Sequence, residues 1–228
     1  MKKPLIILLI STLALSASAC SGSAETGNTA DSSTFTSEEV SKMFQTLPDP
    51  DEYPTESELN SYAFNYRMEL DLSEENGDCM YVVERFENTA AVYEGNREYE
   101  GIKNIYDKAC AKIGKIEGAT KKKLSDLSAC LTQSASLDDD KNILLNYSFR
   151  SPEKIHSVFL TFTPYDSSGT EIRYNNGLSP AITQELQKPF KAAEKKLKIE
   201  TSWKKLNVSE CRLTIAVITT TDGTEVYK

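Results

Sequence analysis

The feature that most constrains the fold is a run of eleven residues in which apolar and polar side chains alternate without a break. The apolar members are Tyr62, Phe64, Tyr66, Met68, Leu70 and Leu72. A period of two places every second side chain on one face of an extended chain, so the pattern predicts a half-buried β-strand. Asn76-Gly77 follows as a turn signal, and residues 79–87 are expected to return as the second strand of an antiparallel hairpin.

Two helices are expected after this hairpin. Residues 98–113 repeat apolar side chains at helical spacing, and residues 121–132 place Leu124, Leu127 and Leu131 on one face. Beyond Asp138-Asp139-Asp140 the segments "NILLNYSF", "IHSVFLTF" and "EIRYN" are typical of strands.

The C-terminal part is expected to hold one more helix and one more strand. Ser179-Pro180 has the cap and the first-turn proline of a helix start, and Pro189 should kink the helix. The final strand would place four alternating residues on one face: Cys211, Leu213, Ile215 and Val217.

The expected element order is therefore ββααβββαβ. Strands and helices are grouped rather than alternating, which predicts an α+β fold with a mainly antiparallel sheet and helices packed on one face. Residues 55–228 should form this as a single domain, because no repeat and no linker follow Pro54.

The N-terminal segment has the organisation of a secretory signal peptide. Lys2 and Lys3 precede an apolar stretch that ends in small residues at Ala19. This stretch of sixteen residues is shorter than the about 20 that a membrane-spanning helix needs. Residues 1–19 are therefore expected to be removed as a signal peptide rather than retained in the membrane.

The last residues of this segment, Ala17-Ser18-Ala19-Cys20, resemble the cleavage site of a bacterial lipoprotein, although Ala17 stands where that pattern usually has leucine. The resemblance implies palmitate and further acyl chains on Cys20, and a protein held on the extracytoplasmic side of a cell-envelope membrane. Since Ala17-Ser18-Ala19 also fits an ordinary signal peptidase, plain secretion is the alternative.

The residues after Cys20 predict a tether. Residues 20–34 are small and polar, and a segment of this composition is expected to remain a flexible linker. Residues 35–54 would form a short helix followed by a proline-rich connector. The helix would either pack on the main domain or bind a partner.

Cysteine usage also favours a lipid on Cys20. Five cysteines would leave an unpaired thiol in a secreted chain, whereas setting Cys20 aside leaves four that could form two structural disulfides. These four are Cys79, Cys110, Cys130 and Cys211. In the expected helical hairpin Cys110 and Cys130 lie about 9 Å out of register, so each is expected to pair with Cys79 or Cys211 instead. We favour Cys79–Cys110 with Cys130–Cys211.

The charge pattern argues against nucleic acid as a partner. The formal net charge is −8, and it becomes −10 without Lys2 and Lys3. Nucleic-acid binding depends on lysine and arginine that neutralise phosphates. The charge is unevenly spread, since residues 36–100 hold 17 acids against 4 bases and residues 101–228 hold 20 bases against 15 acids.

Two lysine clusters could contact anionic lipid headgroups or envelope polymers, although solvated helix faces are the commoner meaning of such patterns. One is Lys121-Lys122-Lys123, and the other comprises Lys188, Lys191, Lys195, Lys196, Lys198, Lys204 and Lys205. Asp138-Asp139-Asp140 could collect a hard cation, but it lacks the spacing of a calcium loop.

The sequence has no usual catalytic constellation and predicts no metal or cofactor. His156 is the only histidine, and no phosphate-binding glycine loop or nucleophile motif occurs. We therefore expect a cell-envelope lipoprotein whose domain acts as a binding or interaction module for an envelope protein or anionic polymer. The alternatives are a carboxylate-based hydrolase and a structural or assembly accessory of the envelope.

Overall fold

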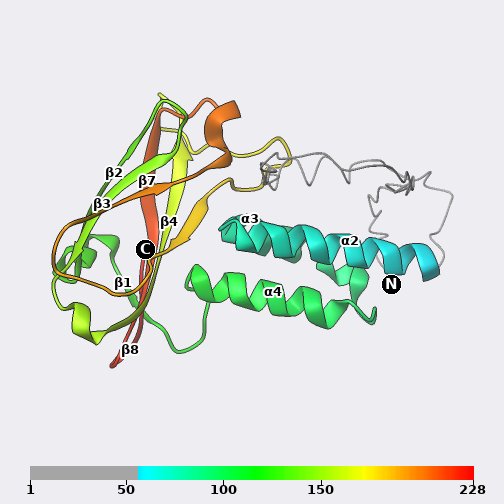
Figure 1. The fold of residues 1–228 in the computed structure, drawn as a ribbon. Helices are drawn as coiled ribbons and strands as arrows, with labels where there is room; N and C mark the ends of the chain where they lie inside the picture. The colour runs from blue at the N-terminus through cyan, green and yellow to red at the C-terminus, as the bar shows by residue number, and fades with distance from the viewer. Residues whose placement is uncertain (1–55) are drawn as a thin grey trace, which may run out of the picture.

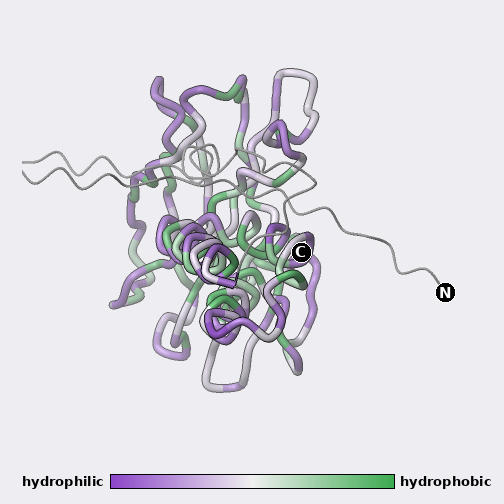
Figure 2. The backbone as a smooth tube through the Cα atoms, turned by 90° about the vertical axis from the view of Figure 1, so that its right-hand side faces the viewer, coloured by the Kyte–Doolittle hydropathy of each residue, from purple (hydrophilic) through white to green (hydrophobic). Residues whose placement is uncertain are grey.

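The protein has an α+β architecture of three layers in a computed structural model that describes residues 56–228. Three helices form the first layer, a five-stranded sheet the second and a three-stranded sheet the third (Figure 1). The helices meet the five-stranded sheet with their ends and project away from it (Figures 1 and 2). The predicted α+β class with mainly antiparallel pairing is confirmed, but the strands form two sheets instead of one, and three helices come first, so the predicted order ββααβββαβ is wrong.

The helices and strands follow the chain in a simple order. The helices come first: α2 (Glu56–Glu75), α3 (Cys79–Thr89) and α4 (Tyr99–Lys112). The five-stranded sheet has the order β1-β8-β7-β4-β5, with β1 (Thr120–Lys122), β4 (Ile155–Tyr165), β5 (Ile182–Glu185), β7 (Glu210–Thr220) and β8 (Gly223–Tyr227). The three-stranded sheet has the order β2-β3-β6, with β2 (Leu131–Leu137), β3 (Ile143–Phe149) and β6 (Lys195–Ile199). Short 3₁₀ turns are η1 (Ala90–Tyr93), η2 (Leu124–Ala129), η3 (Pro152–Lys154) and η4 (Ser202–Lys205).

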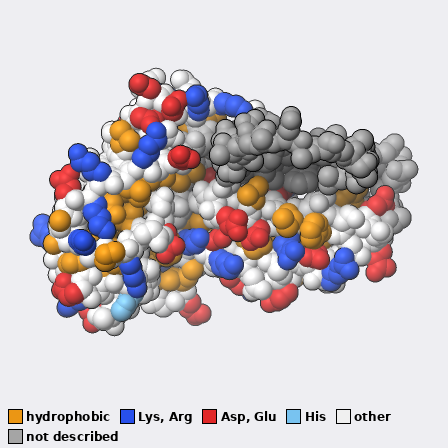
Figure 3. All heavy atoms as spheres, viewed as in Figure 1, with side chains coloured by type: hydrophobic (Ala, Val, Ile, Leu, Met, Phe, Trp, Pro, Cys, Tyr) orange, Lys and Arg blue, Asp and Glu red, His pale blue; other side chains and the backbone are white. Residues whose placement is uncertain are grey.

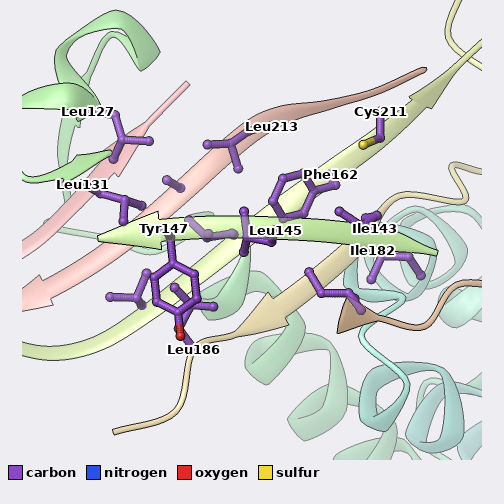
Figure 4. Packing of buried hydrophobic residues seen from close by; sticks show 14 of the residues in the cluster. Leu127, Leu131, Ile143, Leu145, Tyr147, Phe162, Ile182, Leu186, Cys211 and Leu213 are labelled. Carbon is purple, nitrogen blue, oxygen red and sulfur yellow. The ribbon is translucent and has the colours of Figure 1, made fainter. Parts of the chain in front are cut away.

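The five-stranded sheet is buried on both faces. One face packs against the three-stranded sheet, where Phe162 and Leu213 meet Ile143 and Leu145 (Figure 4). The other face packs against the helices through Ile215, Val217 and Val226 among others. This sheet therefore joins the two cores. No helix among residues 56–228 is long and apolar enough to cross a membrane.

The predicted N-terminal hairpin is wrong, because residues 62–72 lie inside α2 and residues 79–87 inside α3. Tyr62, Tyr66 and Leu70 are four residues apart, so they share a helix face as well as a strand face, and all three are buried. The turn at Asn76-Gly77 is present, with Gly77 in the left-handed conformation (φ 84°), but it joins two helices.

The other predicted elements are confirmed in part. Helix α4 matches the prediction for residues 98–113, whereas residues 121–132 form parts of β1 and β2 and the 3₁₀ turn between them. The first two strands predicted after Asp138 are present as β3 and β4, and the turn at Asp222-Gly223 joins β7 to β8. "EIRYN" makes one isolated bridge through Glu171, and the helix expected after Ser179-Pro180 is replaced by β5, a loop and β6.

An irregularity in β7 divides the residues that we expected on one face. The pairing with β4 shifts between Thr161, opposite Ile215, and Phe162, opposite Leu213. This leaves Thr214 as the extra residue of a β-bulge. Cys211 and Leu213 consequently face the three-stranded sheet, while Ile215 and Val217 face the helices.

Candidate anionic-ligand surface

Five of the seven lysines in the second cluster lie on a strand and a loop rather than on a helix, and Lys204 and Lys205 lie in the 3₁₀ turn η4. Lys195, Lys196 and Lys198 belong to β6, and Lys188 and Lys191 belong to the loop between β5 and β6. Glu194 is the only acid between Leu186 and Lys198. Lys195 lies opposite the buried Tyr147, on the inner face of β6, so we call the other four lysines (Lys188, Lys191, Lys196 and Lys198) the lysine surface.

The loop is fixed to the end of β3. The amide of Phe149 donates to the carbonyl of Lys191 at 3.3 Å, and the rings of Phe149 and Phe190 meet edge-on with centroids 5.2 Å apart. The ammonium of Lys195 donates to the carbonyl of Pro189 at 2.6 Å. Pro189, expected to kink a helix, instead belongs to this loop. The contacts of this loop hold its lysines, Lys188 and Lys191, beside the lysines of β6.

Strand pairing aligns Lys196 with polar side chains across the three-stranded sheet, and Lys198 with the exposed Leu144 and with Ser136. Lys196 lies opposite Asn146 on β3, and Asn146 lies opposite Ser134 on β2. Lys198 lies opposite Leu144 on β3, and Leu144 lies opposite Ser136 on β2. Directly paired residues share a sheet face, and this face points away from the buried Ile143 and Leu145. The exposed face thus presents ammonium, amide and hydroxyl donors, which suit oxyanion ligands.

Most of these lysines are available to a ligand. Lys188, Lys191, Lys196 and Lys198 are exposed. Within residues 56–228, only Lys198 of these four has a salt-bridge partner, the carboxylate of Asp138 at 2.8 Å. Arg150, which follows β3, is exposed at the same end of the sheet.

The acidic turn of residues 138–140 is neutralised by lysines rather than arranged around a cation. Asp138 contacts Lys198 and accepts from the amide of Asn142, and Asp140 contacts Lys204 at 2.7 Å. The hydrogen bond from Lys198, helped by Asn142, lowers the pKa of Asp138 to about 2. Among the residues described, no group of three or more histidine, cysteine or acidic side chains is placed to hold a metal ion.

The first lysine cluster is separate from the lysine surface. Lys121 and Lys122 belong to β1, at an edge of the five-stranded sheet, instead of beginning a helix. Lys122 is paired with Glu225 at 2.5 Å. The two clusters therefore do not form a common site.

The prediction of two disulfides is not supported, because Cys79, Cys110, Cys130 and Cys211 are all free thiols. Cys130 lies 3.4 Å from the hydroxyl of Tyr227, which is opposite Ala216 on β7. Ala216 and Cys211 are five residues apart on β7, about 17 Å along the strand, so Cys130 contacts the residue paired with the middle of β7 whereas Cys211 lies near its start.

The thiols are also poor candidates for nucleophilic catalysis. Burial raises the pKa of Cys79 to about 12 and that of Cys211 to about 11. Burial likewise raises the pKa of the Cys110 thiol. Because the thiolate is the reactive form, these three cysteines are core side chains rather than reactive groups.

Sequence reasoning missed the main polar cluster of the helical layer. The carboxylate of Glu69 is 2% exposed, and it accepts from the hydroxyl of Tyr81 at 2.7 Å and from Arg85 at 3.2 Å. The guanidinium of Arg85 lies over the ring of Tyr66, 5.3 Å from its centroid. The charge of Glu69 is thus neutralised by a neighbour, and this arrangement holds helices together rather than forming a pair of catalytic carboxylates. His156 is exposed at the start of β4, apart from this cluster.

Comparison with known proteins gives no assignment, because no protein family, curated protein or solved structure matches the chain. The function is therefore argued from the surface of the molecule.

Proposed function

We propose that the protein is a cell-envelope lipoprotein whose domain binds an anionic polymer through the lysine surface. The observation that supports this most directly is the concentration of five lysines and one acid between Leu186 and Lys198. The remainder of the described chain is acidic, since residues 56–228 outside this segment hold 26 acids against 18 bases. A local basic surface on an acidic protein is more selective than a uniformly basic one, because other anions are repelled elsewhere.

The geometry favours a polymer over the headgroups of the anchoring membrane. Helix α2 begins at Glu56 and its last residues lie near β5, where the amide of Thr183 donates to the carbonyl of Gly77 at 2.7 Å. Twenty helical residues span about 30 Å. The described chain thus begins, at Glu56, at the end of the helical layer far from the sheets, whereas the lysine surface lies on the layer farthest from the helices (Figure 1).

The proposed anchor lies outside the described residues. The expected signal peptide (1–19), tether (20–34) and short helix with its connector (35–54) precede α2, and the proposal places the lipid on Cys20. Intact mass of the protein from the membrane fraction tests this directly. A mass that begins at Cys20 with added acyl groups supports the anchor, and a mass without acyl groups contradicts it.

Binding to long-chain inorganic polyphosphate, followed by calorimetry at several salt concentrations, tests the ligand. Replacing Lys188, Lys191 and Lys196 by glutamine should weaken binding at least tenfold. Since each phosphate contact contributes about 0.7 to the slope of log K against log salt, three lost contacts should reduce that slope by about 2.

A matched variant controls for net charge. It replaces three exposed lysines outside this surface by glutamine: Lys103, Lys108 and Lys121. It should bind polyphosphate like the wild type. Equal losses in both triple variants would show a general charge effect and contradict the proposal. Equally tight binding of the wild type to phosphatidylglycerol vesicles would assign the lysines to lipid headgroups instead.

A further inference from the structure

Helix α2 leaves two large hydrophobic side chains in solvent. Among residues 56–228 the exposed large hydrophobics are Phe64 (44%), Met68 (46%) and Leu144 (40%). The first two are one helical turn apart on α2, and the guanidinium of Arg67 lies 5.6 Å from the centre of the Phe64 ring. Figure 3 shows hydrophobic, acidic and basic side chains interspersed on the surface of the helical part.

These two residues lie within a regular seam along the outer face of α2. The seam consists of Ser57, Ser61, Phe64, Met68, Asp71 and Glu75. All are exposed except Asp71, which is half-buried. The intervals of four, three, four, three and four residues are those of the contact seam in a coiled coil. Another helix can therefore lie along this face, with the apolar residues at the middle of the contact.

The seam is complementary to itself when a second copy runs antiparallel. A two-fold axis between Phe64 and Met68 brings Phe64 of each copy against Met68 of the other, a favourable contact between sulfur and an aromatic ring. The same axis places Ser61 opposite Asp71 and Ser57 opposite Glu75. Each carboxylate then faces a serine in the N-terminal half of the other helix, where the helix dipole favours negative charge, and the hydroxyl of Ser61, which donates to the carbonyl of Ser57 at 3.0 Å within α2, turns to Asp71 on docking.

A parallel arrangement lacks these matches. It would place Asp71 against Asp71 and Glu75 against Glu75, and like charges at such positions are unfavourable. We propose that α2 docks in the antiparallel arrangement on α2 of a second copy of this chain. The proposal is independent of the lysine surface, which lies on the layer farthest from the helices.

The expected dimer is weak in dilute solution and strengthens with salt. One helix from each copy buries less than the about 1,200–2,000 Å² of a stable interface. Residues 56–118 hold 14 acids against 7 bases, so the two helical layers repel each other until salt screens them. Anchoring both copies to one surface would raise their effective concentration.

Disulfide trapping of the full chain tests the arrangement. Cys130 is the one partly exposed cysteine among the described residues, and Cys20 lies outside them, so the variants Ser61→Cys and Asp71→Cys are made in a Cys20→Ser, Cys130→Ser background. In the antiparallel contact residue 61 of one copy meets residue 71 of the other. Identical positions are ten residues out of register, about 15 Å apart, beyond the reach of a disulfide.

We expect a covalent dimer when the two variants are mixed and mildly oxidised, and none from either variant alone or from the background protein. A dimer from Ser61→Cys alone would indicate a parallel contact and overturn the proposal. The absence of any dimer from the mixture would also overturn it.

Sedimentation equilibrium of the full chain provides a second measurement. Phe64→Glu with Met68→Glu should weaken self-association at least tenfold, and both side chains are exposed enough for the fold to survive. Leu144→Glu on the three-stranded sheet is the matched control and should leave self-association unchanged. An equal effect of Leu144→Glu, or a wild type that remains monomeric at high salt, would contradict the proposal.

Discussion

Removing Arg85 should destabilise the protein far more than removing an exposed partner of the same charge. Glu69 is almost completely buried, and Arg85 is the cation beside it at 3.2 Å. Burial lowers the pKa of Arg85, but the nearby charge of Glu69 raises it by more, so the net shift of the Arg85 pKa is upward. Arg85→Ala would leave the carboxylate of Glu69 buried without this charge.

The expected loss is about 3–5 kcal/mol of unfolding free energy, the usual result of removing one partner of a buried pair. Coulomb's law gives a similar figure, since two unit charges 3.2 Å apart interact by about 5 kcal/mol at an effective dielectric constant of about 20. The exposed pair Lys103–Asp107 is the matched comparison, and Lys103→Ala should reduce stability far less than Arg85→Ala, because solvent screens an exposed ion pair.

A double variant separates lost charge pairing from lost packing. Glu69→Gln combined with Arg85→Ala removes the charge but keeps an acceptor for Tyr81, so stability should recover by more than half of the loss. Urea unfolding at neutral pH measures all four proteins, provided that the m-value is unchanged. The reasoning is refuted if Arg85→Ala is no more damaging than Lys103→Ala, or if the double variant is as unstable as the single one.

Three further expectations follow from local geometry. Gly114 and Gly118 have φ angles of 75° and 80°, but only at Gly114 would a Cβ lie 2.5 Å from a β8 side chain, that of Val226. Gly114→Ala should therefore lower the free energy of unfolding in urea by about 1–3 kcal/mol more than Gly118→Ala. NMR titration should give Asp138 a pKa of about 2, and this pKa should rise toward 3.8 in Lys198→Gln. The contribution of ionised Asp138 to the free energy of unfolding should be lost as the pH falls from about 4 to 2. A thiol reagent should modify Cys130 before the three buried cysteines; simultaneous modification would contradict their burial.

The misassigned N-terminal hairpin has an identifiable cause. An uninterrupted alternation contains residues four apart, so Tyr62, Tyr66 and Leu70 fit a helix as well as a strand. Residues 56–75 contain no valine, isoleucine or threonine, the β-branched residues that favour strands. Their absence was the available signal for a helix. In contrast, the strands predicted over β4 and β7 are rich in such residues, and they are confirmed, whereas the confirmed strand β3 contains only Ile143.

The position of β6 could not be found from local sequence. Residues 191–198 read "KAAEKKLK", a composition with high helix propensity. Pairing with β3 and burial of Ile199 between the sheets nevertheless make the segment a strand. Such partners are distant in sequence, and tertiary contacts commonly override weak propensities. The lysines were therefore recognised as a group, but their alignment with Asn146 and Leu144 was not.

The layered fold gives the two proposed contacts opposite responses to salt. Residues 56–118 carry a net charge of −7, and residues 119–228 a net charge of +3. Binding of a phosphate polymer to the lysine surface releases counterions and weakens as salt increases. Docking of two acidic helical layers strengthens, because salt screens their repulsion. Each contact can thus be recognised by the sign of its salt dependence, and since they occupy opposite sides of the five-stranded sheet, one copy can make both at once.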